Sequence, residues 1–188
     1  MPLLLRRILN EKNIHHVKIE TPINAHSRDN IIKQDGLERF VKVALKREKC
    51  DALLVVLDSE GECPAELGVW LANRLRARFP HIPSAVALAN RCYESWLLAS
   101  VETISGKRDL AEFTEEIPDP ESIPSPKRWL TDRMQGTRAY KETRDQVALT
   151  HFVDLHLVRN RSRSFRRLEN ALEQMLTSLQ TRTVMITP

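Results

Sequence analysis

The sequence lacks the short motifs that assign many proteins to a common class. Its 188 residues contain no Walker A phosphate-binding loop and no GxGxxG dinucleotide-binding turn. They also contain no GxSxG nucleophile elbow and no HExxH zinc-binding pair. Each of these motifs positions a phosphate, a nucleophile or a metal through a defined local geometry. The chain therefore carries none of these common signatures of nucleotide-binding proteins and hydrolases.

A long hydrophobic run and a secretory signal are also missing. No segment stays apolar for the length that a membrane helix needs. The apolar start from Met1 to Leu9 is too short for a signal peptide and contains Arg6 and Arg7. Three cysteines are an odd number for a disulfide framework and indicate reduced thiols. We therefore expect a cytoplasmic protein with no membrane partner.

Neither sign of charge dominates. There are 29 basic and 25 acidic residues, so the formal net charge is +4. This balance permits a nucleic-acid partner but does not require one. With 41% hydrophobic residues, the chain has enough apolar material for the core of one α/β domain.

Helices and strands are predicted to alternate over residues 1–100. The unbroken apolar run from Ala52 to Leu57 is typical of a strand buried on both faces, in the middle of a parallel sheet. Alternation of this kind predicts an α/β fold with a mostly parallel sheet flanked by helices. The predicted helices are Pro2–Leu9, Asp35–Glu48 and one that begins at Pro64; the predicted strands are His15–Ile19, Ala52–Leu57 and Ser84–Ala89; Thr21–Asn30 is predicted as a loop.

Residues 101–188 are predicted to form a loop and a helical region packed on that core. The proline-rich stretch Asp109–Pro126 predicts a long irregular loop or lid. A long last helix is expected to begin at Ser162 or Ser164. The short predicted helices are Pro126–Met134, Glu142–Leu149 and His151–Leu157, and the tail Thr181–Pro188 is predicted as an edge strand or as disordered.

Three acidic residues, Asp58, Glu60 and Glu62, follow the apolar run. Parallel sheets bind ligands beyond the carboxyl ends of their strands. Asp58 and Glu60 are two residues apart and can project together from that end, where carboxylate oxygens suit Mg²⁺ or Mn²⁺. The alternative is a solvated acidic turn that leads into a helix. We favour the metal site because these acids end a strand that is expected to be central.

Glu94 follows the predicted strand Ser84–Ala89. Neighbouring parallel strands end at the same edge of a sheet, so we expect Glu94 near Asp58, as a further metal ligand or a catalytic general base. A negative charge near a helix N-terminus is also stabilised by the helix dipole alone. The sequence leaves these two interpretations open.

Basic residues crowd the start of the last predicted helix. A helix N-terminus with arginines and serine hydroxyls can bind phosphate, whereas a solvated arginine face is the alternative. Lys127 belongs to a second basic patch. The residues that we predict to bind phosphate or nucleic acid are Lys127, Arg163, Ser164, Arg166 and Arg167.

Five blocks of the sequence resemble, in order, a family of small bacterial Toprim-like proteins. The blocks are LVVLDSEGECPAELG, ANRCYESWLLA, PKRWLTDRM, GTRAYKETRDQVALT and RSRSFRRLENAL. Members of this family are often encoded beside an ABC/SMC-like AAA ATPase, in loci that look like phage defence. The resemblance implies a Toprim, Rossmann-type α/β fold with a Mg²⁺ site and phosphodiester chemistry on nucleic acid. It also implies an ATPase partner, and the expected nucleic acid is DNA.

By motif, Asp58 and Glu60 match the acidic pair of the family, and Glu94 matches the glutamate of its glutamate-x-tryptophan block. Lys127, Asp145, Gln146, Ser164 and Phe165 match recurring positions to which the resemblance gives no role. Relatives often carry another acid where Cys92 stands.

Toprim domains normally begin with a strand that ends in a glutamate, and neither precedes the helix Pro2–Leu9. We therefore expect a core that lacks its first strand. Two hypotheses follow. The chain is a Mg²⁺-dependent defence nuclease, weakened or inactive without that glutamate, or it is a non-catalytic Toprim-like subunit that docks on the ATPase. Homo-oligomer formation is compatible with both.

Overall fold

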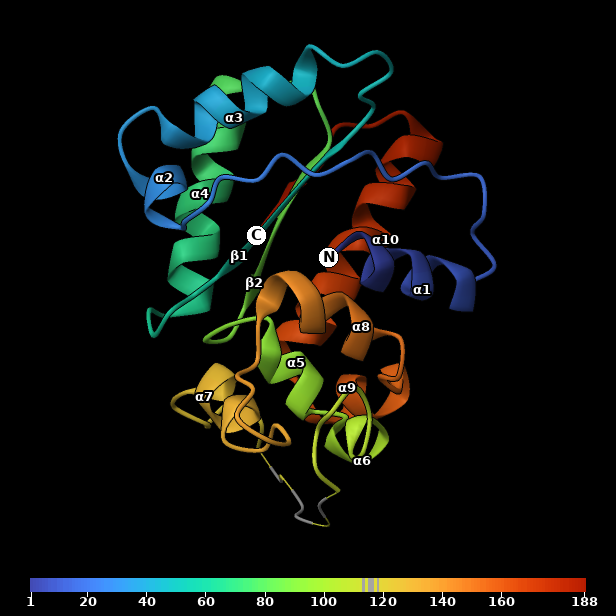
Figure 1. Cartoon of the computed structure of the whole chain (residues 1–188). Coiled ribbons are helices and arrows are strands. Elements are labelled where there is room, and N and C mark those ends of the chain that lie inside the picture. Colours follow the sequence, from blue (N-terminus) through green and yellow to red (C-terminus); the bar gives the residue numbers. More distant parts are fainter. Residues whose placement is uncertain (113, 115–116, 118) are drawn as a thin grey trace. The chain divides into compact units, whose positions relative to one another are not determined.

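The structure, a computed structural model, describes residues 1–112, 114, 117 and 119–188. These residues form two compact units (Figure 1). The helical unit comprises Met1–Thr21 and Cys92–Phe165, and the sheet unit comprises Pro22–Arg91 and Arg166–Pro188. This division differs from the expected boundary at residue 100, because each unit is built from two separate segments of the chain.

The sheet unit contains three parallel strands in the order β1-β2-β3. Their bounds are Leu53–Asp58 for β1, Ser84–Ala89 for β2 and Ile186–Thr187 for β3. Strands β1 and β2 pair over their whole length, and Asp58 lies opposite Ala89 at the carboxyl end. The short strand β3 confirms the edge-strand alternative for the tail.

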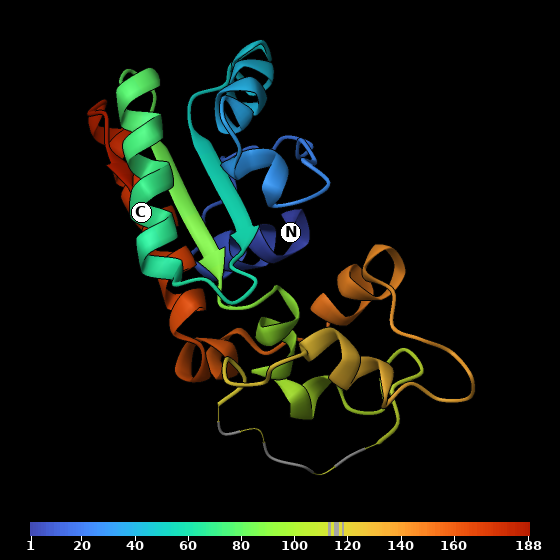
Figure 2. The same cartoon turned by 90° about the vertical axis from the view of Figure 1, so that its left-hand side faces the viewer.

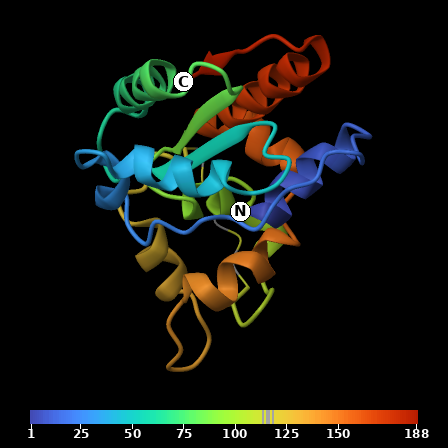
Figure 3. The same cartoon turned by 90° about the horizontal axis from the view of Figure 1, so that it is seen from above.

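Helices cover both faces of this sheet (Figures 1 and 3). On one face, Leu37 and Val41 join Leu71 and Leu75 in a core with Val86. On the other face, Ala171 and Met175 of α10 pack against Ala85 and Leu54. The helices are α2 (Asp29–Ile32), α3 (Gly36–Leu45) and α4 (Pro64–Arg78) on the first face and α10 (Arg163–Thr181) on the second. The prediction of a parallel α/β sheet flanked by helices is confirmed.

The central strand is β2, and the prediction that the run Ala52–Leu57 lies in the middle of the sheet is wrong. All six residues of β2 are buried, whereas β1 is half-buried after Leu53 and pairs only with β2 among the described residues. Ala85 and Ala87 are two residues apart in β2, so their small side chains lie on the same face, the face that α10 covers, while Val86 and Leu88 face α4. A hydrophobic run indicates that a strand is buried, but it does not indicate whether the strand pairs with other strands on one edge or on both.

The helical unit is built around α5 (Glu94–Leu98), in which every residue is buried. Arg7 joins its two chain segments, since its guanidinium donates to the carbonyl oxygens of Thr150 and Val153 (2.5 and 2.6 Å). The other elements are α1 (Pro2–Glu11), α6 (Val101–Ile104), α7 (Pro126–Thr131), the π-helical turn η1 (Glu142–Gln146), α8 (Val147–Thr150), α9 (Leu155–Arg161) and the start of α10.

Three local predictions need correction or a limit. Residues His15–Ile19 form no strand. The helix expected at His151–Leu157 begins at Leu155 instead, because Asp154 caps it by accepting from the amides of His156 and Leu157. The predicted loop Asp109–Pro126 contains no helix in its described part before Pro126, where α7 begins, and residues 113, 115, 116 and 118 lie outside the described residues.

No helix among the described residues is long and apolar enough to cross a membrane. The three cysteines, all of them described, form no disulfide with one another.

Candidate functional site

The segment from Asp58, the last residue of β1, to Glu62 is here called the acidic turn and lies in the sheet unit (Figure 2). Ser59 is buried and ties the turn to the chain that follows β2. Its amide donates to the carbonyl oxygen of Ala89 (3.0 Å), and its hydroxyl accepts from the amide of Arg91 (2.9 Å). Glu60 has a positive φ of 53°, in the left-handed region that residues other than glycine seldom adopt.

Arg28 supplies an internal counter-charge to this turn. Its guanidinium donates to the carbonyl oxygen of Ser59 (2.8 Å) and lies 3.0 Å from a carboxylate oxygen of Glu62. Its Nε atom lies 3.8 Å from a carboxylate oxygen of Glu60, and only 13% of the Arg28 side chain is exposed. Sequence reasoning missed this residue, although it is the one Lys or Arg in the predicted loop Thr21–Asn30.

The acidic turn does not gather its carboxylates into a three-ligand cluster. Among the described residues, no three His, Cys, Asp or Glu side chains are arranged so that they could hold a metal ion. Glu60 and Glu62 are instead directed to Arg28, while Asp58 ends β1 and is half-buried. A metal here would therefore use at most two of the three predicted acids, with water and substrate oxygens completing its shell.

Glu94 begins α5 in the helical unit, and none of its surface is exposed. One carboxylate oxygen, Oε1, accepts hydrogen bonds from the hydroxyl of Tyr140 (2.7 Å) and the side-chain amide of Gln146 (3.1 Å). The other oxygen, Oε2, is buried and has no hydrogen-bond partner. Buried carboxylate oxygens are nearly always paired, so this atom has an unmet demand for a proton donor or a cation.

Tyr140 is the second functional residue that sequence reasoning missed. Burial, together with the negative charge of Glu94, raises the pKa of Tyr140 well above its ordinary value. The phenol therefore stays protonated at physiological pH and keeps donating to Oε1 of Glu94. One signal in the sequence could have identified Tyr140: it lies inside one of the resemblance blocks, six residues before Gln146.

Gln146 is held in place by the turn η1. The buried carboxylate of Asp145 accepts from the amide of Lys141 (2.8 Å) and from the guanidinium groups of Arg138 and Arg144. Burial alone raises the pKa of Asp145, but these hydrogen bonds and positive charges together lower it below its ordinary value. Isolated π-helical turns often occur at functional sites. This one holds the side chain of Gln146 where it donates a hydrogen bond to Glu94.

The predicted phosphate site at the start of α10 holds a carboxylate of the same chain. Oε1 of Glu121 accepts from the hydroxyls of Ser162 and Ser164 (both 2.6 Å) and from the amide of Ser164 (2.8 Å). Ser164 is buried and also accepts from the indole of Trp96 (2.8 Å). A phosphate could bind to these donors only by displacing Glu121.

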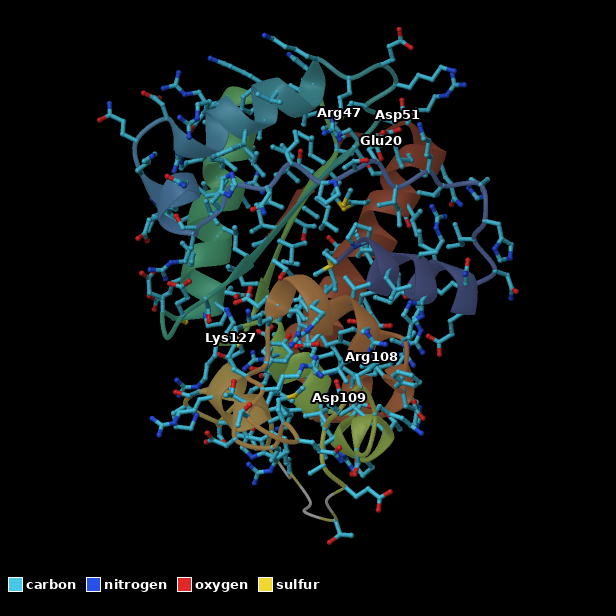
Figure 4. All side chains as sticks on the ribbon, in the orientation of Figure 1. Glu20, Arg47, Asp51, Arg108, Asp109 and Lys127 are labelled. Atoms are coloured by element: carbon cyan, nitrogen blue, oxygen red, sulfur yellow. The ribbon has the colours of Figure 1, made fainter. Side chains whose placement is uncertain are left out.

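The predicted arginines of α10, by contrast, are open to solvent. Arg163, Arg166 and Arg167 are all exposed. Lys127 on α7, labelled in Figure 4, is half-buried and pairs with Glu142 at 2.7 Å. The arginines are therefore better placed than Ser164 or Lys127 to meet a phosphate group.

The chain is an α/β protein with a parallel sheet and a buried carboxylate, Glu94, one oxygen of which has no hydrogen-bond partner. The chain belongs to the family described as "Domain of unknown function (DUF4276)", whose model matches residues 1–173. No curated protein and no solved structure matches the chain.

Proposed function

We propose that this chain is a Toprim-type, Mg²⁺-dependent nuclease or nuclease subunit of bacterial anti-phage defence, which cleaves phosphodiester bonds of DNA in the cytoplasm. The observation that carries the proposal is Glu94, a fully buried carboxylate whose Oε2 atom has no hydrogen-bond partner. Retaining such an atom is unfavourable for folding, and groups of this kind concentrate where chemistry requires them.

The oxygen donors on the chain suit Mg²⁺ or Mn²⁺. Asp58, at the carboxyl end of β1, is the residue that would hold the ion, and Glu60 would join it after leaving Arg28. A bound ion would offset negative charge on the phosphodiester and lower the pKa of a coordinated water. Two carboxylates are a common protein contribution to a Mg²⁺ site that also receives substrate oxygens.

The other steps use side chains of the protein. Tyr140 and Gln146 fix Oε1 of Glu94, which leaves Oε2 to accept a proton from the attacking nucleophile. Arg163, Arg166 and Arg167 would bind backbone phosphates of the nucleic acid. Mutating these arginines should weaken binding of all sequences and reduce its dependence on salt.

A second function, a non-catalytic Toprim-like subunit that docks on an ABC/SMC-like AAA ATPase, is favoured by one observation. Arg28 already pairs with Glu60 and Glu62 and offsets part of their negative charge, which weakens their attraction for a metal ion. In that case the acidic turn is a structural ion pair, and Asp58 has no catalytic role.

Cleavage of plasmid and single-stranded DNA in Mg²⁺ or Mn²⁺, with and without the ATPase, separates the two functions. The nuclease predicts cleavage that is lost in Asp58→Asn and Glu94→Gln but kept in Asp51→Asn, an exposed acid just before β1. The same assay with RNA tests the substrate class. If the wild type and the ATPase together cleave nothing but form a stable complex, the docking subunit is the better description.

A further inference from the structure

A groove that the proposed chemistry leaves unused lies on the sheet unit, between α2 and the first turns of α4. Its volume is about 690 Å³. Ile32, Leu67 and Trp70 provide its apolar surface. Trp70 is 44% exposed, and its neighbour Val69 is 48% exposed. Large apolar side chains that are adjacent, exposed and next to a groove are typical of protein-binding surfaces.

The indole of Trp70 is held in place before any partner binds. The guanidinium of Arg74 lies over the Trp70 ring, 4.7 Å from its centroid. Arg74 is itself fixed by two hydrogen bonds to Glu38 and by one to the carbonyl oxygen of Ile32 (3.2 Å). A rigid aromatic anchor loses little conformational entropy on binding, which is why such residues dominate many interfaces.

The polar rim of the groove is acidic. Asp29, Glu62 and Glu66 face a single lysine, Lys33. Arg28 pairs with Glu62 at 3.0 Å and with Asp29 at 3.8 Å, and 79% of the Asp29 side chain is exposed. The three carboxylates outnumber the two cations beside them, Arg28 and Lys33, so the rim keeps a negative charge that attracts cationic groups and repels phosphates. The charge therefore selects a basic protein segment over nucleic acid.

We infer that this groove docks a segment of another protein, which presents apolar side chains to Trp70 and lysines or arginines to Asp29, Glu62 and Glu66. The inference does not depend on nuclease activity, because none of these side chains except Glu62 belongs to the predicted site. It gives the chain a protein-binding face with a charge opposite to that of the arginines on α10.

A labelled amphipathic helix of leucine and lysine is a suitable probe, with a leucine–glutamate helix of the same pattern as its control. Fluorescence anisotropy measures affinity for the full chain, and the indole N–H signal of Trp70 in NMR spectra reports the groove directly. We expect the leucine–lysine peptide to shift this signal, and Trp70→Ala and Glu66→Lys each to weaken binding roughly tenfold or more. The matched controls are Val43→Ser and Glu48→Lys, which change exposed residues of the same unit outside the groove.

Three results would overturn the inference. The first is no binding of the leucine–lysine peptide, or binding that the groove variants weaken no more than their controls do. The second is equal binding of the leucine–glutamate peptide, which would show apolar adhesion without charge selection. The third is concentration-dependent self-association that Trp70→Ala abolishes in sedimentation experiments, which would assign the groove to a second copy of this chain.

Discussion

Arg28 is the residue whose replacement tests most directly how the acidic turn is held. Arg28→Gln removes a charged hydrogen bond to the carbonyl oxygen of Ser59 and three partly exposed ion pairs, with Asp29, Glu60 and Glu62. The hydrogen bond contributes about 1.5 kcal/mol or more and each exposed pair about 0.2–1 kcal/mol, so the free energy of unfolding should fall by about 2–4 kcal/mol. For a chain of this size that corresponds to a decrease in Tm of roughly 5–15 °C.

The same substitution should increase the affinity of the turn for divalent cations, because Glu60 and Glu62 lose their internal counter-charge. Thermal unfolding with and without Mg²⁺ measures both effects. A cation at about 100 times its Kd stabilises a protein by about 2.7 kcal/mol, so saturating Mg²⁺ should restore much of the lost stability. Arg78→Gln, which removes an exposed arginine from the end of α4, is the matched control and should change neither quantity appreciably.

Two outcomes would refute this reasoning. If Arg28→Gln unfolds at the same temperature as the wild type, the guanidinium does not hold the turn. If Mg²⁺ stabilises the variant and the wild type equally, Arg28 does not compete with a cation, and the metal interpretation of Glu60 and Glu62 loses its basis.

Three further predictions concern the scaffold. Ser164→Ala leaves the indole of Trp96 without its acceptor and should lower the free energy of unfolding by about 1–3 kcal/mol in urea titrations; retention of wild-type stability would contradict the hydrogen-bond network. The pKa of folded Asp145 is lowered from 3.8, so its stabilising contribution is present above that pH and is lost as the pH falls through the folded value. Asp145→Asn should therefore destabilise the protein at pH 7 more than in acid, and equal losses at both pH values would exclude this linkage. A Cβ atom at Gly36 would overlap the carbonyl oxygen of Asn30, so Gly36→Ala should destabilise the protein by roughly 1–3 kcal/mol, whereas an unchanged midpoint would show that the turn before α3 can move.

The α/β class was predictable because periodicity and apolar runs act locally. The stripe of Leu67, Leu71 and Leu75 and the run Ser84–Ala89 report their own burial through residue type. The order of the strands was not predictable in the same way. The strand order depends on which strand has a neighbour on each side, and that strand is β2. The sequence pointed to β1 instead, because β1 has the longer apolar run and β2 has the smaller side chains.

For the candidate site, the sequence predicted some of the residues that take part but not the residues with which they pair. The sequence marked Glu60, Glu62 and Ser164, but their partners Arg28 and Glu121 come from segments predicted as loops. Pairing between a loop side chain and a distant turn leaves no periodic signal in the sequence. The sequence therefore does not reveal which basic residue pairs with a cluster of acids, and only the folded structure shows it.

The two acidic features differ in how their charge is compensated, and this difference assigns them different roles. Glu60 and Glu62 face the cation Arg28, whereas Glu94 has only neutral donors, Tyr140 and Gln146, and no ion pair among the described residues. A buried carboxylate compensated in this way is held at the expense of stability.

Glu94→Gln removes the buried charge while it keeps the size of the side chain. If Glu94 is retained for catalysis, the variant should unfold at the same or a higher temperature than the wild type and should lose cleavage. Tyr140→Phe is the matched comparison, because it keeps the charge and removes one of its two donors, which leaves Gln146 as the donor to Oε1. It should lower the free energy of unfolding by about 1–3 kcal/mol. If Glu94→Gln is destabilised as strongly as Tyr140→Phe, the carboxylate is a structural acceptor, and the nuclease proposal loses the observation that carries it.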